Sequence, residues 1–503
     1  MKISITPKEI NEVSADIAIA FVYQGAKLSG DALILDRAVS GSLSRLILQD
    51  GFEAKTGQCI CIPILQDTGK VLLARKIAVV GLGNKKMFTL DVLRRVGATV
   101  AKMSHAAKAE KIICSMPESS NIKDAQKFSQ AFAEGVLLSS YRFHTYHGTQ
   151  KKKDPKQKEL KEVYISESRN VHAKNSILGI TQAETLVQAT NMVRDLVNLT
   201  SADVTPLVLA QYAKKIIGKN ISVEILSQEK MKKLGMMAAL AVARGSVHPA
   251  VGVHIVYKPS GAKKRIALVG KAVTFDSGGL SLKPADKMHT MKCDMAGAAT
   301  VIGVCSILEK LKLHVEVHGI FLAVENMPGG NAYRPGDIVT AMDGTTIEVL
   351  NTDAEGRVTL ADALTYAKSF SPDVIIDLAT LTGACIVALG EDIAAVLSND
   401  KKLAKKLLDA ADETGEPLWE LPLYEPYADM VKSKIADLKN IGGGSGGGTI
   451  TAAMFLRPFV GDTPWAHLDI AGPSYTEKES RPDQPYGASG YGVRLLAHFL
   501  SGF

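Results

Sequence analysis

The sequence predicts an α/β protein with two α/β domains, of which the second contains a mostly parallel central sheet flanked by helices. Three observations lead to this prediction. The chain has 503 residues, more than one simple hydrophobic core usually holds. Short apolar runs alternate with stretches of helical periodicity. Charged residues directly follow several apolar runs, and functional sites of parallel sheets lie at the carboxyl ends of the strands.

The composition is that of an ordinary globular protein, with 46% hydrophobic and 22% charged residues. The net charge of +7 is a mild excess, which permits contact with nucleic acid without requiring it. Six cysteines lie mostly in apolar stretches, as reduced and buried thiols do. The sequence shows no signal-peptide pattern and no run of about 18 apolar residues, so we expect a cytoplasmic protein without a membrane span.

Residues 1–170 are predicted to form the N-terminal domain. The predicted elements are buried strands at Ile17–Val22 and Lys76–Gly81 and a helix at Leu90–Met103. Gly81-Leu82-Gly83 after the second strand could begin a dinucleotide-binding turn, but Lys86 stands where that motif needs its third glycine. A plain strand-to-helix turn is therefore favoured over a nucleotide-dependent oxidoreductase.

A charged stretch and a helix separate the two domains. Residues 151–158 contain five lysines and a proline, which favours a solvated loop over the alternative, a phosphate-binding patch. An amphipathic helix at about 184–199 is predicted to link the N-terminal domain to a second domain, residues 171–503.

The second domain shows strong α/β alternation. The predicted elements are strands at Ile266–Gly270, Val315–Glu325 and Asp373–Leu378 and an apolar helix at Ala298–Leu311. Helix-length segments between the strands predict a parallel sheet covered on both faces. The glycine run Gly442–Gly448 is predicted to be a flexible loop, since no Lys-Ser/Thr pair of a phosphate-binding loop follows it.

Three stretches of the second domain place charged residues at strand ends or helix starts. They contribute Lys271 and Asp276, then Asp294, then Asp353, Glu355 and Arg357. Taken singly, Asp294 is explained as a helix N-cap and Asp353 with Arg357 as a local ion pair. Together, several acids in an apolar setting repel one another and lose hydration, which is costly unless a cation holds them.

Four carboxylates are enough to bind two divalent ions. Such paired ions lie about 3.5–4 Å apart and activate a shared water. The candidate ligands are rich in oxygen and lack histidine, which suits Mg²⁺, Mn²⁺ or Zn²⁺ better than copper. The sequence contains no His-Glu-x-x-His helix, which excludes a zincin-type protease.

The heptapeptide Asn351–Arg357 resembles, without a change, the signature of the leucyl (cytosol) aminopeptidase family of metallopeptidases, in its bacterial form. Gly270–Gly279, Met291–Ala299 and Trp465–Gly472 are similar to further blocks of that family, in the same order. The resemblance is close from Thr181 to the C-terminus and extends to the N-terminal part only in layout. Four features depart from the family pattern: Ala272, Ala296, the segment Asn198–Ser201, which lacks the proline usual in the family, and the glycine-rich loop Gly442–Gly448.

The resemblance implies a metal-dependent aminopeptidase that removes N-terminal residues, leucine-like and other apolar ones preferred, through a metal-bridging hydroxide. It implies peptide substrates with a free N-terminus, a homohexamer, and a macro-like N-terminal domain with an oligomeric or regulatory role. Some bacterial members of the family also bind DNA, so a secondary DNA-binding role is a second hypothesis. Within this sequence, only the +7 charge and the run Lys151, Lys152 and Lys153 favour it.

The resemblance also implies site residues. The implied ligands of two divalent ions, Mn²⁺ or Zn²⁺ with Mg²⁺ as an alternative at the exchangeable position, are Lys271, Asp276, Asp294, Asp353 and Glu355. The implied catalytic residues are Lys283, which would polarise the scissile carbonyl, and Arg357, which would hold a bicarbonate ion as general base. The implied substrate-binding residues are Met291, Thr380, Leu381 and Gly383.

Overall fold

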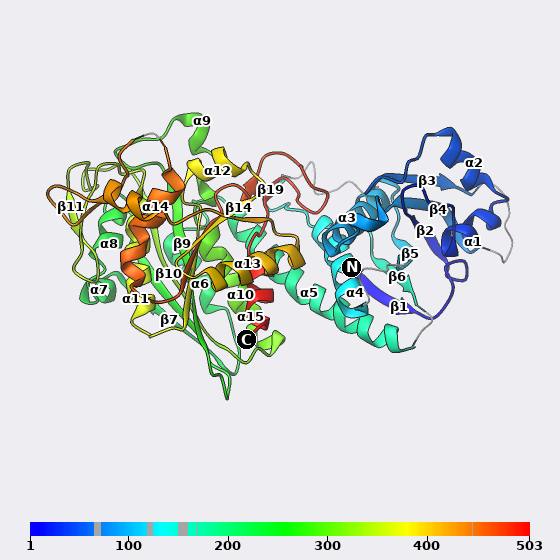
Figure 1. Cartoon of the computed structure of the whole chain (residues 1–503), viewed down its shortest axis with the longest axis horizontal. Helices are drawn as coiled ribbons and strands as arrows, with labels where there is room; N and C mark the ends of the chain where they lie inside the picture. The colour runs from blue at the N-terminus through cyan, green and yellow to red at the C-terminus, as the bar shows by residue number, and fades with distance from the viewer. Residues whose placement is uncertain (65–71, 118–123, 149–158, 168–169, 445) are drawn as a thin grey trace. The chain divides into compact units, whose positions relative to one another are not determined.

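The N-terminal unit is built on a six-stranded sheet with the order β1-β6-β5-β2-β4-β3 (Figure 1). The computed structural model describes residues 1–64, 72–117, 124–148, 159–167, 170–444 and 446–503. The strands are β1 (Lys2–Thr6), β2 (Ala15–Val22), β3 (Cys59–Pro63), β4 (Ala74–Gly81), β5 (Lys111–Ser115) and β6 (Glu162–Ser166). All neighbouring strands are parallel except β3 and β4. The two strands predicted in this region are confirmed as β2 and β4.

Helices cover both faces of this sheet because side chains of β2 alternate between two cores. Ile17 and Ile19 belong to the hydrophobic cluster that contains residues of the third and fourth helices, while Ala18 and Ala20 belong to the cluster of the first two. These helices are α1 (Gly30–Ala38), α2 (Ser42–Gln49), α3 (Leu90–Ala106) and α4 (Ala125–Ser139). The predicted α/β organisation of this region is therefore correct.

The C-terminal unit contains an eight-stranded sheet with the order β15-β14-β17-β13-β9-β10-β8-β7. The strands are β7 (Ile221–Leu226), β8 (Val251–Tyr257), β9 (Arg265–Asp276), β10 (Glu316–Asn326), β13 (Val374–Ala379), β14 (Ala394–Ser398), β15 (Leu418–Glu420) and β17 (Trp465–Asp469). The four central strands, β17, β13, β9 and β10, are mutually parallel. Their carboxyl ends consequently meet at one edge of the sheet.

Two helices sandwich the central strands, as the predicted fold class requires. The helices are α10 (Ala296–Leu311) and α11 (Glu355–Lys368). On β10, a Cβ atom at Gly319 would approach Cys305 of α10, whereas the next residue, Ile320, belongs to the hydrophobic cluster that includes α11. Successive side chains of a strand point to opposite faces, so α10 and α11 cover opposite faces. The helix predicted at Ala298–Leu311 is α10 with one more half-turn at its start.

The helix α5 (Asn170–Asn198) contains most of the predicted linking helix and spans the division between the two units. The N-terminal unit ends at Gln188 within α5 and also includes residues 413–415 and 478–485. The second of these segments carries Arg481, whose guanidinium lies 3.0 Å from Asp91 of α3 and 3.1 Å from Asp483. Burial opposes the charge of Arg481, but the two carboxylates outweigh it and raise its pKa. These ion pairs connect two sequence-distant segments within the N-terminal unit.

Among the described residues, one segment is long and apolar enough to cross a membrane by composition alone. It is Ala285–Leu311, which includes α10, and 78% of its most apolar window is buried inside the protein. Buried core helices meet the same criteria, so the segment is weak support for a membrane span.

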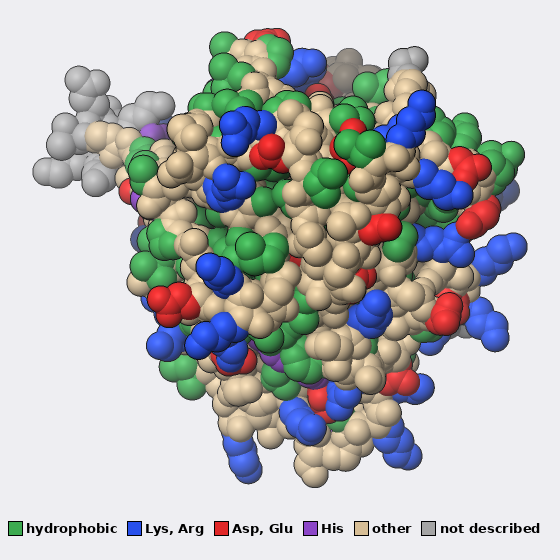
Figure 2. Space-filling view, turned by 90° about the vertical axis from the view of Figure 1, so that its left-hand side faces the viewer, with side chains coloured by type: hydrophobic (Ala, Val, Ile, Leu, Met, Phe, Trp, Pro, Cys, Tyr) green, Lys and Arg blue, Asp and Glu red, His purple; other side chains and the backbone are tan. Residues whose placement is uncertain are grey.

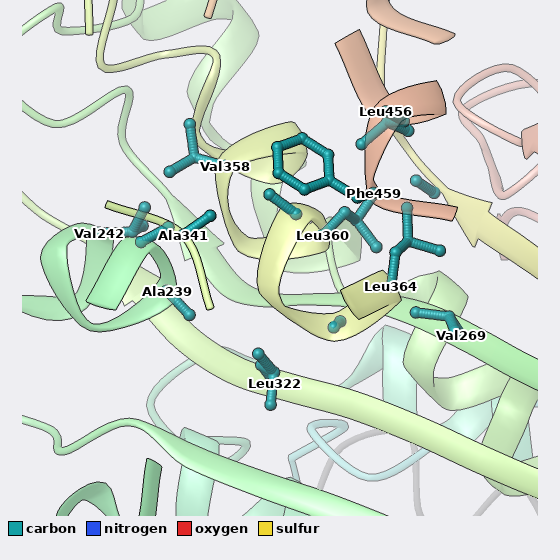
Figure 3. Packing of buried hydrophobic residues seen from close by; sticks show 14 of the residues in the cluster. Ala239, Val242, Val269, Leu322, Ala341, Val358, Leu360, Leu364, Leu456 and Phe459 are labelled. Carbon is teal, nitrogen blue, oxygen red and sulfur yellow. The ribbon is translucent and has the colours of Figure 1, made fainter. Parts of the chain in front are cut away.

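The core around α11 holds the sheet edge in place. Leu360 and Leu364 of α11 belong to the same hydrophobic cluster as Val269 of β9 and Leu322 of β10, and Figure 3 shows Leu364 next to Val269. All four side chains are at most 2% exposed. Burial of this kind provides the main stabilising free energy of the unit.

We expect Leu364→Ala to lower the free energy of unfolding by about 2–5 kcal/mol, because it removes apolar contacts and leaves a cavity. The matched control is Leu207→Ala in α6 (Pro206–Lys214), where the leucine is 50% exposed and the expected loss is about 1 kcal/mol or less. Urea denaturation followed by tryptophan fluorescence measures both, since Trp419 and Trp465 lie in the C-terminal unit. Equal losses would contradict this account of the core.

Candidate active site at the carboxyl edge of the sheet

Strand β9 supplies two charged side chains of the site, one within the strand and one at its end. Lys271 points to the α11 face, because a Cβ atom at Gly356 would overlap its side chain. Gly356 is therefore a position where close approach of α11 to β9 requires a glycine. Asp276 is the last residue of β9 and is 2% exposed.

Lys271 lies between two carboxylates that come from segments far apart in the sequence. Its Nζ is 2.7 Å from Oδ1 of Asp294 and 3.0 Å from Oε1 of Glu355, and it donates a 3.0 Å hydrogen bond to the carbonyl oxygen of Thr380. Burial disfavours the charged ammonium, but the neighbouring carboxylates outweigh burial and hold the pKa of Lys271 above its ordinary value. The lysine is thus the centre of a buried ion-pair cluster.

A second lysine approaches the same acids from the loop after β9. Nζ of Lys283 lies 2.8 Å from Oδ2 of Asp276 and also forms an ion pair with Asp353. Burial alone would lower the pKa of Lys283, but the carboxylates raise it. This loop is joined to the heptapeptide, because the Thr352 hydroxyl donates a 2.7 Å hydrogen bond to the Gly278 carbonyl oxygen.

The structure excludes two simpler roles considered from the sequence, Asp294 as a helix N-cap and Asp353 as the ion-pair partner of Arg357. Asp294 is not the N-cap of α10, since Met295 holds that position and Oδ1 of Asp294 accepts a 2.7 Å hydrogen bond from the Thr380 hydroxyl. Asp353 pairs with Lys283 and not with Arg357. The periodicity of the sequence predicts a helix only from Val358, with Asp353 and Glu355 on the loop before it, but α11 begins at Glu355, where a carboxylate in the first turn interacts favourably with the helix dipole.

Arg357 is a buried cation with an unusual environment. It is 8% exposed, and within the described part of the chain its Nε has no hydrogen-bond partner and its guanidinium no ion pair. Burial lowers its pKa to about 10, against the opposing effects of Glu355 and Asp469. A guanidinium in this state is suited to binding an anion.

The acids of the site fit divalent cations. One carboxylate oxygen from each of Asp276, Asp353 and Glu355 lies within 4.8 Å of the others. Burial raises the pKa of Glu355 and that of Asp294 above their ordinary values, against the lowering effect of Lys271. Among the described residues, the buried oxygens Oδ2 of Asp294 and Oε2 of Glu355 have no hydrogen-bond partner. The four carboxylates outnumber the two ammonium groups, so the site favours the binding of additional cations. Oxygen ligands suit Mg²⁺, Mn²⁺ or Zn²⁺.

The residues expected to bind substrate lie around this cluster. Thr380 and Leu381 directly follow β13 and are half-buried, while Gly383 is exposed at the start of α12 (Gly383–Leu389). Met291 begins the short 3-10 turn that carries Asp294 and is half-buried. The segment after β13 is held by Asp469, which accepts hydrogen bonds from the Leu381 backbone N–H at 3.2 Å and the Thr382 hydroxyl at 2.7 Å.

Family models match both parts of the chain. The catalytic domain of the cytosol aminopeptidase family matches residues 191–497, and the N-terminal domain of that family matches residues 19–150. The chain belongs to the cytosol aminopeptidase family. It is a hydrolase, a metal-dependent aminopeptidase that acts on peptides, and the resemblance seen in the heptapeptide is confirmed.

Relatives of similar length extend over nearly the whole chain. A protein of Persephonella marina named "Probable cytosol aminopeptidase" is 41% identical over 99% of both chains, and one of Trichormus variabilis with the same name is 43% identical over 99% of both. Among solved structures, a mutant of tomato leucine aminopeptidase has a TM-score of 0.89 at 34% identity and covers 100% of this chain and 97% of that one. The bottromycin maturation enzyme BotP in complex with Mn has a TM-score of 0.84 at 33% identity, with coverages of 97% and 99%.

Sequence reasoning missed Asn326, the last residue of β10. Its Nδ2 donates hydrogen bonds of 2.8 Å to Oδ1 of Asp276 and 3.0 Å to the carbonyl oxygen of Thr352. It thereby fixes an acid of the site against the heptapeptide. Its position in the sequence could have indicated it, since Asn326 directly follows a predicted strand, as Lys271 does.

Replacing Asn326 with alanine is expected to weaken metal binding about 10–100-fold, because the hydrogen bonds that orient Asp276 are lost. The control is Asn399→Ala, which removes comparable hydrogen bonds to Thr463 and Trp465 at the opposite edge of the sheet. Competition with a chromophoric chelator measures the affinity of both proteins for Mn²⁺. An effect of Asn399→Ala as large as that of Asn326→Ala would contradict the specific role of Asn326.

Proposed function

We propose that this aminopeptidase removes the N-terminal residue of peptides at the carboxyl edge of β9 and β13, with two divalent ions bound by the acidic cluster. The observation that carries the proposal is the convergence of Asp276, Asp353 and Glu355 within 4.8 Å beside the buried Lys271 and the half-buried Lys283. When bound, two divalent ions would provide a water ionised to hydroxide between them at neutral pH and positive charge for the carbonyl oxygen.

The proposed ligands are the five side chains that the family resemblance implies, and the closeness of their charged groups supports them. Lys271, Asp276, Asp294 and Glu355 would hold the tighter ion, and Asp276, Asp353 and Glu355 would hold the exchangeable ion. Lys271 binds through its neutral amine, because divalent cations beside it reverse the effect of the carboxylates on its pKa. The convergence of Asp294 and Glu355 on its Nζ supports this assignment. We propose Mn²⁺ or Zn²⁺ as the native ions, with Mg²⁺ as an alternative at the exchangeable position.

Two cationic side chains complete the proposed reaction. Lys283 donates to the carbonyl oxygen of the scissile bond and stabilises the negative charge that develops on it. Arg357 would hold a bicarbonate ion, which would supply a general base for the attacking water and a proton for the leaving amine. The buried guanidinium of Arg357, which has no ion-pair partner in the described ranges, supports its role as an anion holder.

The remaining features of the proposal concern specificity and context. Met291, Thr380, Leu381 and Gly383 line the pocket for the N-terminal side chain, and the apolar character of Met291 and Leu381 supports a preference for leucine-like residues. We propose a homohexamer that acts in the cytoplasm, with residues 1–170 as a domain of oligomeric or regulatory role and residues 171–503 as the catalytic domain.

We expect Glu355→Gln to lower turnover of leucine p-nitroanilide by on the order of 10²-fold or more, because an uncharged amide is a poor metal ligand. Chelation should abolish the activity of the natural chain, and Mn²⁺ or Zn²⁺ should restore it. Circular dichroism monitors the fold. The control Glu229→Gln changes an exposed acid of the same unit and should leave turnover unchanged. Full activity of metal-free protein would exclude the mechanism.

An amine-anchoring role of the ions is tested with paired substrates. Leucine p-nitroanilide should be cleaved and its N-acetylated form should not, because an acetylated nitrogen cannot bind a metal ion through its lone pair. Equal cleavage of the two would contradict the exopeptidase proposal, whatever the result of chelation.

Arg357→Met should lower kcat by about 10²–10⁴-fold, since a general base contributes a factor of that size. In carbonate-free buffer, added bicarbonate should raise the kcat of the natural chain in a saturable way and leave the variant unchanged. Arg334→Met, at an exposed arginine, should keep the response. A variant at Arg357 that still responds to bicarbonate would exclude this binding site.

A DNA-binding role stays a prediction from the sequence. The run Lys151, Lys152 and Lys153 lies outside the described residues. On the face that Figure 2 shows, Lys and Arg side chains are interspersed with acidic and apolar ones. Salt-dependent binding of duplex DNA that is lost when the three lysines are neutralised would support the role.

A further inference from the structure

We propose that the N-terminal unit binds a nucleoside phosphate in a cavity at the carboxyl edge of its own sheet. The cavity has a volume of about 500 Å³ and is lined only by residues of this unit. Small-molecule sites typically measure about 300–1,000 Å³. The inference is independent of the peptidase site, which lies in the other unit.

The cavity lies where the chain topology creates a crevice. Strands β2 and β5 are neighbours and parallel. From β2 the chain passes through α1 and α2 to β3 and then β4 on one side, whereas from β5 it passes through α4 to β6 on the other side. The connections leave in opposite directions and on opposite faces of the sheet, so the loops after the two strands diverge. Ligands of open α/β sheets bind at such switch points.

The loops that follow three parallel strands line the cavity. Residues 21–27 and 29–32 come from the end of β2, the loop after it and the start of α1. Leu82 and Lys85 follow β4, and Ser115–Pro117 end and follow β5. The cavity is therefore a consequence of the sheet order and not a gap between loosely packed helices.

One part of the lining suits a phosphate group. Lys27 and Lys85 line the cavity and are exposed. The nine-residue helix α1 begins at Gly30, and its N-cap residue Ser29 makes no side-chain hydrogen bond to the first turn. Gly25 and Gly30 have φ of 71° and 52°, and no atom lies within 4 Å of a Cβ built on either. Backbone N–H groups at the open start of a helix, with two lysines nearby, form a favourable environment for an anion.

Another part of the lining suits a base and a sugar. Tyr23, Leu82 and Met116 provide aromatic and apolar surface. The Tyr23 ring is supported edge-on by Phe88, with 5.4 Å between ring centroids. Asp31, which also lines the cavity, offers a carboxylate acceptor for the hydroxyl or N–H groups of a nucleoside. Free phosphate would use only the lysines and the helix start, whereas a nucleoside phosphate matches both parts.

Gly81 and Gly83 have a separate, structural explanation. A Cβ atom at Gly81 would overlap the backbone of Lys55, and one at Gly83 would overlap the Thr56 side chain. These two glycines permit the turn after β4 to pack closely against residues 55 and 56, as the plain turn predicted from the sequence requires. The proposed phosphate group would instead bind at the segment that follows β2.

The test is isothermal titration of the full-length protein with ADP in the presence of a chelator, with adenosine and inorganic phosphate titrated separately. We expect saturable ADP binding at least about tenfold tighter than either fragment, because each fragment makes only part of the contacts. Glu355→Gln should retain ADP binding although it loses peptidase turnover. The test of ADP binding is therefore independent of the test of the peptidase proposal.

Lys85→Ala should weaken ADP binding on the order of tenfold, as expected for the loss of one charge-assisted contact to phosphate. The matched control is Lys86→Ala on the same 3-10 turn, which removes an equally exposed charge that does not line the cavity. Both variants should keep full peptidase turnover. The proposal is overturned if ADP does not bind saturably at millimolar concentration, if phosphate binds as tightly as ADP, if Lys86→Ala has the same effect as Lys85→Ala, or if Glu355→Gln abolishes binding.

Discussion

The catalytic unit depends on the burial of one ammonium group, that of Lys271, between Asp294 and Glu355. A buried charge is costly unless its partners hold it in good geometry, and removing one partner leaves the others uncompensated. The three side chains come from β9, from the turn before α10 and from the first turn of α11, on both faces of one sheet. The charge cluster therefore constrains the relative positions of the strand and both helices, and it leaves acidic oxygens available to cations.

Close backbone packing makes this cluster possible. A Cβ atom at Gly270 would overlap the backbone of α10, and one at Gly356 would overlap the Lys271 side chain. Both helices can therefore approach β9 more closely than larger residues would allow. Asn326 and Thr352 then fix the loops by hydrogen bonds, so that Asp276 is oriented before any ion binds. Such preorganisation is what a metal site requires from the surrounding protein.

The two units use the same property of parallel sheets for different chemistry. In each, the loops after adjacent parallel strands bring together side chains that are distant in the sequence. In the C-terminal unit the ends of these strands and the segments that follow them carry four acids and two lysines with a buried arginine nearby, which suits metal ions and an anion. In the N-terminal unit they carry two exposed lysines and apolar side chains around a cavity.

The sequence by itself indicated the alternation of strands and helices along the chain and the residue types of the site. Periodicity located β2, β9 and α10, because the burial of one face is a local property, and the heptapeptide indicated a metallopeptidase. The tertiary structure alone decided the partners: Lys283 with Asp353, Asn326 with Asp276, and Arg357 without an ion pair among the described residues. It also placed Glu355 inside α11, where the periodicity of the sequence had shown no helix. These outcomes depend on contacts between segments about 50 to 80 residues apart, which strand pairing and helix packing create and local sequence patterns do not encode.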